Sequence, residues 1–337
     1  MRAVVLVGGF GTRLRPLTST IPKPMLPVGH VPIIERLVAN LGRSGITEVT
    51  LALGFKPEPF VQAFPDGECA GVTLHYAVEP EPLDTAGAIR FAADAAGIDD
   101  TFVVANGDIL TDLDVSQLVT FHRDHGAEAT IHLIGVPDPS AFGVVAIGDD
   151  GRVERFVEKP APGTAPSNLI NAGTYVLEPS VLQRIPLGEK VSIERATFPL
   201  IADAGGLFAM ATDDYWVDTG RPELYLQANL DVLAGTRRHD RCEGVHPDAT
   251  VDSAAVIQQS VIGAGAVVGE AAIARSVLLP GAVVESGAVV TDSVIMGHVS
   301  AGAVVHNSVL GAAGVIASGE QVSDERRPDP HAGPSSA

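Results

Sequence analysis

The sequence predicts an α/β domain built on a doubly wound mixed sheet, followed by a short left-handed parallel β-helix. Up to about residue 232, short β-rich runs alternate with amphipathic helical runs, which is typical of such a sheet. Beyond about residue 248 the helix signal fades, and small aliphatic residues recur every six positions, as in a parallel β-helix. The 337-residue chain also exceeds what one hydrophobic core usually organises, so we expect two domains.

The first domain is expected to alternate strands and helices from its first residues. The predicted strand runs are 3–7, 48–53, 73–78 and 101–108, and the predicted helices are 33–41 and 88–96. Ligands of such sheets bind beyond the carboxyl ends of parallel strands. The most unusual loops of the sequence follow Val7 and Ala105, at two such ends, so we expect them to face one cleft.

The second domain is predicted from a change in residue pattern along the chain. Charged residues, Gly and Pro interrupt the apolar pattern between Ala234 and Asp248. The expected division is a first domain at 1–232, a linker at 233–247, a β-helix at 248–322 and a disordered polar tail at 323–337. The hexads allow roughly four coils, with irregular corners near Ala274 and Met296 where the spacing slips. A β-sandwich is the alternative, but its strands do not require a six-residue repeat.

Composition narrows the class of protein. The formal net charge of −19 argues against a nucleic acid or an anionic membrane as partner. Neither a signal peptide nor a transmembrane segment is expected, and two isolated cysteines, Cys69 and Cys242, fit a reducing compartment, so we expect a cytoplasmic protein. The histidines form no zinc motif.

A glycine-rich segment, GGFGTRLRPLTSTIPKPMLPV at 8–28, directly follows the first strand. Gly8, Gly9 and Gly11 let backbone N–H groups approach phosphate oxygens, as a triphosphate requires. Arg13 and Lys23 add mobile cations that can neutralise charge on a phosphorus centre and its leaving group. The segment is neither a Walker loop nor a GxGxxG fingerprint.

The full segment resembles the signature of the sugar-phosphate nucleotidylyltransferases, also called NDP-sugar pyrophosphorylases, and its PKPMLPV ending is most similar to their mannose-1-phosphate guanylyltransferase branch. The resemblance implies a Rossmann-like nucleotidyltransferase fold with a C-terminal hexapeptide-repeat domain. It also implies transfer of a nucleotidyl group from GTP to mannose-1-phosphate with release of pyrophosphate. Arg13 would contact the leaving pyrophosphate, and Lys23 the phosphates at the reacting centre.

Two isolated acids are candidate metal ligands. Asp108 ends an ANGD motif after an apolar strand, and Asp218 lies in YWVDTGRPELY. Mg²⁺ keeps several waters and takes few protein ligands, which two carboxylates satisfy. In isolation Asp108 also reads as a turn former and Asp218 as a helix cap before Pro222. The resemblance pairs the two carboxylates as the Mg²⁺ site.

The resemblance also assigns the remaining contacts. Glu158 can accept from sugar hydroxyls and Lys159 can pair with the sugar's phosphate. The implied sugar-phosphate contacts are Gly143, Glu158, Lys159, Asn171 and Gly173. The implied nucleotide contacts are Leu6, Gly8, Gly9, Gly11, Thr12, Glu79, Thr85, Ala86, Gly87, Asn106 and Gly107.

The base pocket carries a departure from the family. A carboxylate such as Glu79 accepts well from guanine N1–H and N2–H₂, which favours GTP. The family's usual LGTAG reads Leu83, Asp84, Thr85, Ala86, Gly87 here. Asp84 either caps the helix that begins near Thr85, which we favour, or places a negative charge near the base.

Other functions stay open at this point. Glucose-1-phosphate with dTTP, UTP or ATP is an alternative substrate pair. A hexapeptide acyltransferase is a second alternative and would use His298 or His306 as base. A regulatory paralogue that binds nucleotide sugar without chemistry is a third. The intact set of Arg13, Lys23, Asp108 and Asp218 argues against this third alternative. The β-helix is expected to mediate homo-oligomerisation.

Overall fold

The computed structural model describes residues 1–9, 11–54 and 57–329. Two compact units emerge, and neither follows the expected division at residue 232. The first consists of Met1–Gly9 and Ile34–Trp216, and the second of Phe10–Ile33 and Val217–Ala337. The glycine-rich segment therefore groups with the C-terminal part of the chain, because its contacts are made there.

The first unit contains the predicted mixed sheet. Within the described residues, ten strands run in the order β11-β10-β12-β7-β1-β4-β6-β5, with β9 pairing β12 and β13. Their bounds are β1 Arg2–Leu6, β4 Glu48–Leu53, β5 Glu68–Cys69, β6 Val72–Val78, β7 Phe102–Asn106, β9 Ala129–Gly135, β10 Gly143–Ile147, β11 Val153–Glu158, β12 Leu169–Leu177 and β13 Leu207–Thr212. Strand β7 pairs β1, and β1 pairs β4, both in parallel, whereas β12 pairs β7 antiparallel.

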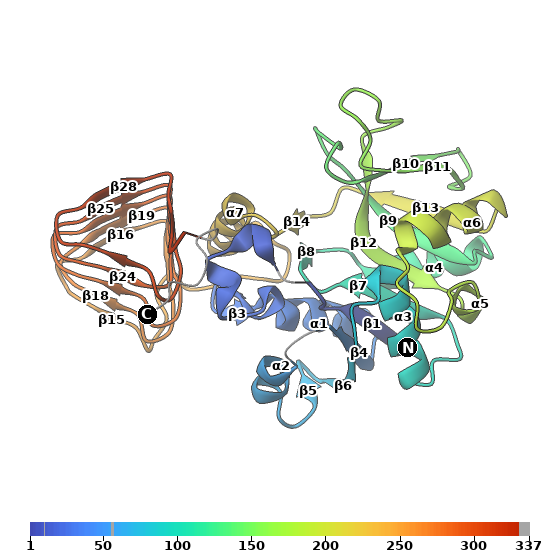
Figure 1. Ribbon diagram of the computed structural model, residues 1–337, viewed down its shortest axis with the longest axis horizontal. Coiled ribbons are helices and arrows are strands. Elements are labelled where there is room, and N and C mark those ends of the chain that lie inside the picture. Colours follow the sequence, from blue (N-terminus) through green and yellow to red (C-terminus); the bar gives the residue numbers. More distant parts are fainter. Residues whose placement is uncertain (10, 55–56, 330–337) are drawn as a thin grey trace. The chain divides into compact units, whose positions relative to one another are not determined.

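Helices cover both faces of this sheet. The consecutive residues Ala3, Val4 and Val5 of β1 are all buried, which requires cover on both sides because side chains alternate along a strand. The further elements of the chain up to residue 218 are α1 Ile33–Arg43, α2 Glu58–Ala63, α3 Asp84–Ala95, β8 Ile109–Thr111, α4 Val115–Asp124, α5 Pro179–Gln183, the π-helix η4 Ile193–Thr197, α6 Phe198–Asp203 and β14 Trp216–Asp218. Figure 1 shows α3, α4 and α6 beside the strands.

The second unit joins short turns, one helix and the β-helix. The glycine-rich segment forms the 3₁₀ turns η1 Thr12–Leu14, η2 Leu17–Ser19 and η3 Lys23–Met25, and the strands β2 Pro27–Val28 and β3 Val31–Pro32. Helix α7 spans Pro222–Ala234. Proline at its first position suits the N-terminus, and Gly235, at φ 70°, ends it in the left-handed region.

Three parallel sheets of five strands each form the β-helix in the described part of the chain. Their strands are β15 Thr250–Val251, β18 Val267–Val268, β21 Val283–Val284, β24 His298–Val299 and β27 Val315–Ile316; β16 Val256–Gln258, β19 Ala272–Ala274, β22 Val289–Thr291, β25 Val304–His306 and β28 Gln321–Ser323; and β17 Val261–Ile262, β20 Val277–Leu278, β23 Val294–Ile295, β26 Val309–Leu310 and β29 Arg326–Arg327. Figure 1 shows them stacked as successive coils, so the predicted left-handed β-helix is confirmed, with more than the expected four coils.

One corner recurs in every coil and explains the slipped hexads. Gln259, Arg275, Asp292, Asn307 and Asp324 all have positive φ, and each of the first four precedes a buried serine. The corner at Ala274 is therefore regular, not irregular as expected. Because this turn is tight, a coil takes fewer than three full hexads: Thr250 pairs Val267, 17 residues on, and Val267 pairs Val283, 16 residues on.

The serines form a ladder through this corner. The hydroxyl of Ser276 accepts from the backbone N–H of Ser293 at 3.1 Å and donates to the carbonyl of Ala274 at 2.8 Å. The same pair of bonds recurs at Ser260, Ser293 and Ser308. Each serine thus satisfies two buried backbone groups that the sharp turn removes from the strand ladder.

The expectation of a disordered tail from residue 323 is wrong for the described residues 323–329. Ser323 ends β28, and Arg326–Arg327 form β29, which pairs with β26 through Val309 and Leu310. Edge pairing with the preceding coil gives these polar residues backbone partners. Residues 330–337 of the expected tail lie outside the described residues. Among the described helices, none is both long and apolar enough to cross a membrane.

Candidate active site

Asp218 lies at the centre of a charged cluster in the second unit. Its Oδ1 accepts from Lys23 Nζ at 3.1 Å and from the Gly220 backbone N–H at 2.9 Å. Arg13 Nη2 lies 3.8 Å from Oδ2 of the same carboxylate. The helix-cap alternative does not hold, because Arg221 is the N-cap of α7 and the Asp218 side chain bonds elsewhere. Two cations thus meet one acid, the set expected where a triphosphate is handled.

Lys23 and Arg13 differ in how freely they move. Lys23 is 6% exposed, so it is not the mobile cation that the sequence suggests. The Arg13 side chain is 61% exposed and is free to follow a phosphate. A buried ammonium beside a carboxylate is a fixed charge, whereas an exposed guanidinium can reorient on a ligand. The cluster therefore offers one fixed and one adaptable cation.

Gly220 provides room for all three charged groups. A Cβ at Gly220 would lie 2.9 Å from Arg13 Nη2, 2.9 Å from Asp218 Oδ1 and 3.2 Å from Lys23 Nζ. No side chain fits there without moving them. Gly220 was not among the residues predicted from the sequence. It ends the DTG triplet that begins at Asp218, and this position was the sequence feature that could have indicated it.

The turn before Arg13 is fixed within its own segment. Gly11 has φ 55°, in the left-handed region that glycine adopts readily, and its carbonyl accepts from the Thr18 hydroxyl at 2.7 Å. Thr12, the next implied nucleotide contact, is exposed and begins η1. Of the N–H groups expected to meet phosphate, those of Gly11 and Thr12 therefore belong to this turn.

In the first unit, the implied nucleotide contacts lie at the carboxyl ends of neighbouring parallel strands. Leu6 ends β1 and pairs with Asn106, which ends β7, and Gly107 N–H donates to the Leu6 carbonyl at 2.8 Å. Gly8 and Gly9 follow β1, and half-buried Asp108 follows β7. The loops after β1 and β7 are thus adjacent, as the sequence predicts for a doubly wound sheet.

Glu79 lies at the next strand end, directly after β6. It is 7% exposed, and its Oε2 accepts from the Leu83 N–H at 2.9 Å. Burial raises the pKa of this carboxyl, an effect that the Leu83 hydrogen bond partly offsets. No described residue donates to Oε1. Glu79 therefore holds the loop to α3 with one oxygen, whereas its other oxygen accepts no hydrogen bond from the described residues.

Asp84 and Thr85 begin α3 in distinct ways. Asp84 has φ 60°, which explains why glycine is usual there in the family pattern, and its Oδ1 accepts from the Thr85 N–H at 2.9 Å. This bond satisfies one free N–H of the first helical turn. Asp84 is nevertheless not the expected N-cap, because Leu83 holds that position without a side-chain cap and Asp84 is the first helical residue. The Thr85 hydroxyl donates to Glu194 at 2.8 Å and accepts from Ile193 N–H at 2.8 Å.

These two bonds commit the Thr85 side chain to the fold and give Glu194 a role that sequence reasoning missed. Ala86 and Gly87 donate to the Val191 carbonyl, and a Cβ at Gly87 would meet the Glu189 carbonyl at 2.5 Å. The start of α3 is thus fixed by the 189–194 segment. The backbone N–H groups of Thr85, Ala86 and Gly87 thus all donate within the chain, so the structure does not present them as free donors for a nucleotide.

The implied sugar-phosphate residues gather on three neighbouring strands of the first unit. Gly143 of β10 pairs with Glu158 of β11, whose Oε1 lies 3.4 Å from Lys159 Nζ. Asn171 donates to the Tyr175 hydroxyl at 2.9 Å and accepts from Gly173 N–H at 2.9 Å. The structure thus brings an acid, a base and an amide to one end of β10, β11 and β12, the mixture that a phosphorylated sugar needs.

Close contacts join this group to the nucleotide side of the first unit. Gly173 has φ 75°, and a Cβ there would lie 2.6 Å from Asn106 Nδ2. The Trp216 indole donates to the Ala172 carbonyl at 2.9 Å and meets Phe142 edge-on at 5.8 Å. Trp216 therefore acts through packing. It contacts Ala172, the residue after Asn171, and Phe142, the residue before Gly143.

The two expected metal ligands belong to different units, Asp108 to the first and Asp218 to the second. Within the described ranges, no group of three or more His, Cys, Asp or Glu side chains is arranged to hold a metal. Of the alternative bases, His298 pairs with Glu285 at 2.8 Å and His306 meets Thr291 at 2.9 Å, on separate sheets of the β-helix.

Comparisons with known proteins agree with both halves of this geometry. Residues 2–235 match the family described as nucleotidyl transferase, and residues 246–333 match the GlmU-like C-terminal hexapeptide family. The chain belongs to the nucleotidyl transferase family.

Individual relatives are similar over most of their length. The mannose-1-phosphate guanylyltransferase of Mycobacterium tuberculosis is 41% identical over 278 residues, covering 79% of this chain and 76% of that protein. Mannose-1-phosphate guanylyltransferase 1 of Arabidopsis thaliana is 38% identical over 273 residues, covering 80% and 75%. Among solved structures, HddC from Yersinia pseudotuberculosis, also solved in complex with GMP-PN, has a TM-score of 0.59 and 30% identity, covering 68% of this chain and 97% of that one.

Proposed function

We propose that this chain transfers the guanylyl group of GTP to mannose-1-phosphate, forming GDP-mannose and pyrophosphate. The observation that carries the proposal is the cluster of Arg13, Lys23 and Asp218, held at hydrogen-bond and ion-pair distances beneath a glycine-rich turn. Relatives named mannose-1-phosphate guanylyltransferase, near 40% identity over most of the chain, support the substrate pair.

In the proposed reaction, a phosphate oxygen of the sugar phosphate forms a bond to the α-phosphorus of GTP, and the bond to the pyrophosphate oxygen breaks. Both reactants are anions, so the protein's task is positioning and charge neutralisation. Exposed Arg13 follows the leaving pyrophosphate, and buried Lys23 offers a fixed charge at the reacting phosphates. Lys159 binds the sugar's phosphate, and Glu158 and Asn171 accept and donate at the sugar hydroxyls.

Magnesium fits the acids of the chain. Carboxylate oxygens are the ligands that Mg²⁺ prefers, and Asp218 is already oriented by Lys23 and Gly220, as a ligand must be. We assign Asp218 and Asp108 as its protein ligands. When bound, the ion offsets the charge of the phosphate oxygens.

The preference for guanine rests on Glu79. Oε1 of this carboxylate has no partner among the described residues, and it can accept from guanine N1–H or N2–H₂. Glu79→Gln keeps an acceptor for Leu83 N–H but replaces one ligand-facing acceptor with a donor. The ratio of kcat/KM for GTP to that for dTTP should fall by about 10- to 200-fold, as removal of one specific contact does. An unchanged ratio contradicts this reading of the base.

The direct test is pyrophosphate release by the purified protein with Mg²⁺, using GTP, dTTP, UTP and ATP, each with mannose-1-phosphate and glucose-1-phosphate. We expect the highest kcat/KM for GTP with mannose-1-phosphate. Release with another pair only would keep the reaction and overturn the substrates. No release with any pair would contradict the enzyme reading and favour a non-catalytic, nucleotide-sugar-binding paralogue.

Variants separate the roles within the cluster. Arg13→Ala should lower kcat by about 10²- to 10³-fold, the usual effect of losing one electrostatic donor, with an unchanged melting temperature because the side chain is exposed. Asp108→Asn and Asp218→Asn should each abolish magnesium-dependent release. Full activity in both Asn variants would rule out the metal assignment.

We further propose that the β-helix mediates self-association. Outward-facing valines on two of its sheets, Val256, Val267, Val304 and Val315, are 37–59% exposed. Apolar residues repeated along a flat face favour association with a second copy. Light scattering of the purified chain tests this, and a monodisperse monomer at micromolar concentration would contradict it.

A further inference from the structure

The last coils of the β-helix contact the segment that bears Arg13. Arg326, in β29, donates from Nη1 to the backbone carbonyl of Arg13 at 2.9 Å, across 313 residues of sequence. Two coils supply further contacts in the same unit: the Thr20 hydroxyl lies 3.9 Å from Met296 Sδ, and a Cβ at Gly311 would lie 2.7 Å from Pro16 Cβ. The whole stretch from η1 to η2 thus rests on the β-helix.

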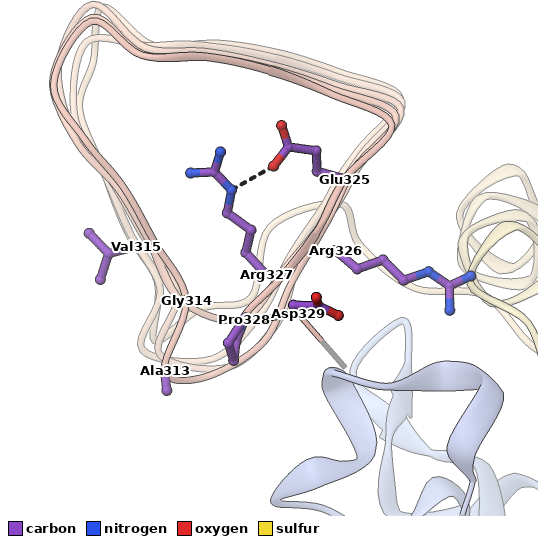
Figure 2. Close-up of a pocket in the computed structure, with 8 residues that line it drawn as sticks. All are labelled: Ala313, Gly314, Val315, Glu325, Arg326, Arg327, Pro328 and Asp329. Carbon is purple, nitrogen blue, oxygen red and sulfur yellow. Dashed lines mark hydrogen bonds and ion pairs between the residues drawn. The ribbon is translucent and has the colours of Figure 1, made fainter. Parts of the chain in front are cut away.

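Arg326 and its neighbour Arg327 are directed differently. Figure 2 shows Arg327 extending across the end of the coil toward Glu325, whereas Arg326 extends out of the coil. Arg327 is bonded within the β-helix, to Glu320 and Glu325, each at 2.7 Å. The hollow of about 840 Å³ at this end is lined by the final coil itself. Of the two arginines, Arg326 is the one that donates a hydrogen bond to the glycine-rich segment in the described part of the chain.

The backbone at Arg13 needs such support. The Arg13 side chain is 61% exposed, so packing does not locate its guanidinium. Its position follows from the backbone of η1, which Thr18 fixes on the preceding side through the Gly11 carbonyl. A charge-assisted hydrogen bond from a guanidinium is stronger than one between neutral groups, and it restrains the peptide that carries Arg13.

We propose that Arg326 is a positioning residue for the nucleotidyl transfer, acting through the backbone of Arg13, and that the final coil of the β-helix is thereby part of the catalytic apparatus. This inference rests on the proposed role of Arg13. It assigns to the hexapeptide-repeat part of the chain a function in chemistry, in addition to self-association.

The test is a double-mutant cycle on the full chain with GTP and mannose-1-phosphate. Arg326→Ala should lower kcat about tenfold, since small misplacements of a reacting group are costly, and should change KM for mannose-1-phosphate by less than about twofold. Arg326→Lys keeps a charged donor and should recover a large part of the loss. Arg326 is exposed, so melting temperatures should stay at the wild-type value.

Arg327→Ala is the matched control, because it removes the same charge from the same strand without touching the glycine-rich segment. It should lower the melting temperature through its two lost ion pairs and leave kcat near wild type. In an Arg13→Ala background the backbone carbonyl at position 13 remains, but the guanidinium that it positions is absent. Arg326→Ala should therefore lower kcat by less than about twofold in that background.

Three outcomes overturn the inference: equal kcat for the Arg326 and Arg327 variants, a full loss from Arg326→Ala on top of Arg13→Ala, or an Arg13→Ala enzyme with normal kcat. The reaction itself is judged separately, by wild-type pyrophosphate release. The failure of the inference and the failure of the proposed function are therefore distinguishable.

Discussion

Gly220→Ala perturbs the cluster at Asp218 without removing any charge. The added Cβ would lie 2.9 Å from Arg13 Nη2 and from Asp218 Oδ1, whereas ordinary contacts begin at 3.4 Å. Each group must therefore move by about 0.5 Å. Since a displacement of about 1 Å can cost about 10²-fold in rate, we expect kcat to fall about tenfold.

The assay is steady-state pyrophosphate release, with melting temperature measured in parallel. Gly135→Ala is the matched control, because a Cβ there meets only Asn168 Nδ2, at 3.7 Å, and the residue is exposed. The control should match wild type in kcat. A Gly220→Ala enzyme with kcat within about twofold of the control would refute the view that Asp218 and Lys23 act from fixed positions.

Three further predictions concern stability and the base. Burial lowers the pKa of His132 from 6.5 to about 4. Between those pH values the unfolded chain binds a proton at this histidine and the folded chain does not, so the free energy of unfolding should fall by about 3 kcal/mol as the pH drops. His132→Gln should abolish this pH dependence in denaturant titrations. Ser276→Ala leaves the buried N–H of Ser293 unpaired and should lower the free energy of unfolding by about 1–3 kcal/mol. Ser286→Ala is the control: the hydrogen bond that its hydroxyl accepts from Glu270 N–H is exposed, so the loss should be less than about 1 kcal/mol. Asp84→Gly relieves a positive φ but loses one hydrogen bond, so the free energy of unfolding should change by less than about 1 kcal/mol. If the variant instead alters the preference for GTP over dTTP, the charge of Asp84 lies near the base.

Local pattern predicted the elements whose burial is regular. Strand β4 matches the expected 48–53, because five of its six residues are buried and four of them, Val49 and 51–53, are apolar. Helix α3 begins one residue before the expected Thr85. The recurrence of small aliphatic residues every six positions was enough to predict the β-helix, since each hexad forms one face of a coil.

Long-range contacts limited the prediction of the site. The burial of Lys23 depends on Asp218, 195 residues away, and the role of Glu194 depends on Thr85, 109 residues away. No local spacing encodes such pairs. The ordered start of the expected tail escaped prediction for the same reason, because polar Arg326 and Arg327 gain their strand partners from the preceding coil.

The grouping of Phe10–Ile33 with the C-terminal coils bears on the order in which the chain is made. A ribosome adding about 5–20 residues per second needs about 16–60 s to travel the 313 residues between Arg13 and Arg326. During that interval the glycine-rich segment exists without the coil that supports it, although the sheet of the first unit can already form. On the proposed role of Arg326, a nascent chain would thus turn substrates over slowly until its last coil closes, and messages truncated before β29 would yield proteins with an intact sheet and an unsupported Arg13.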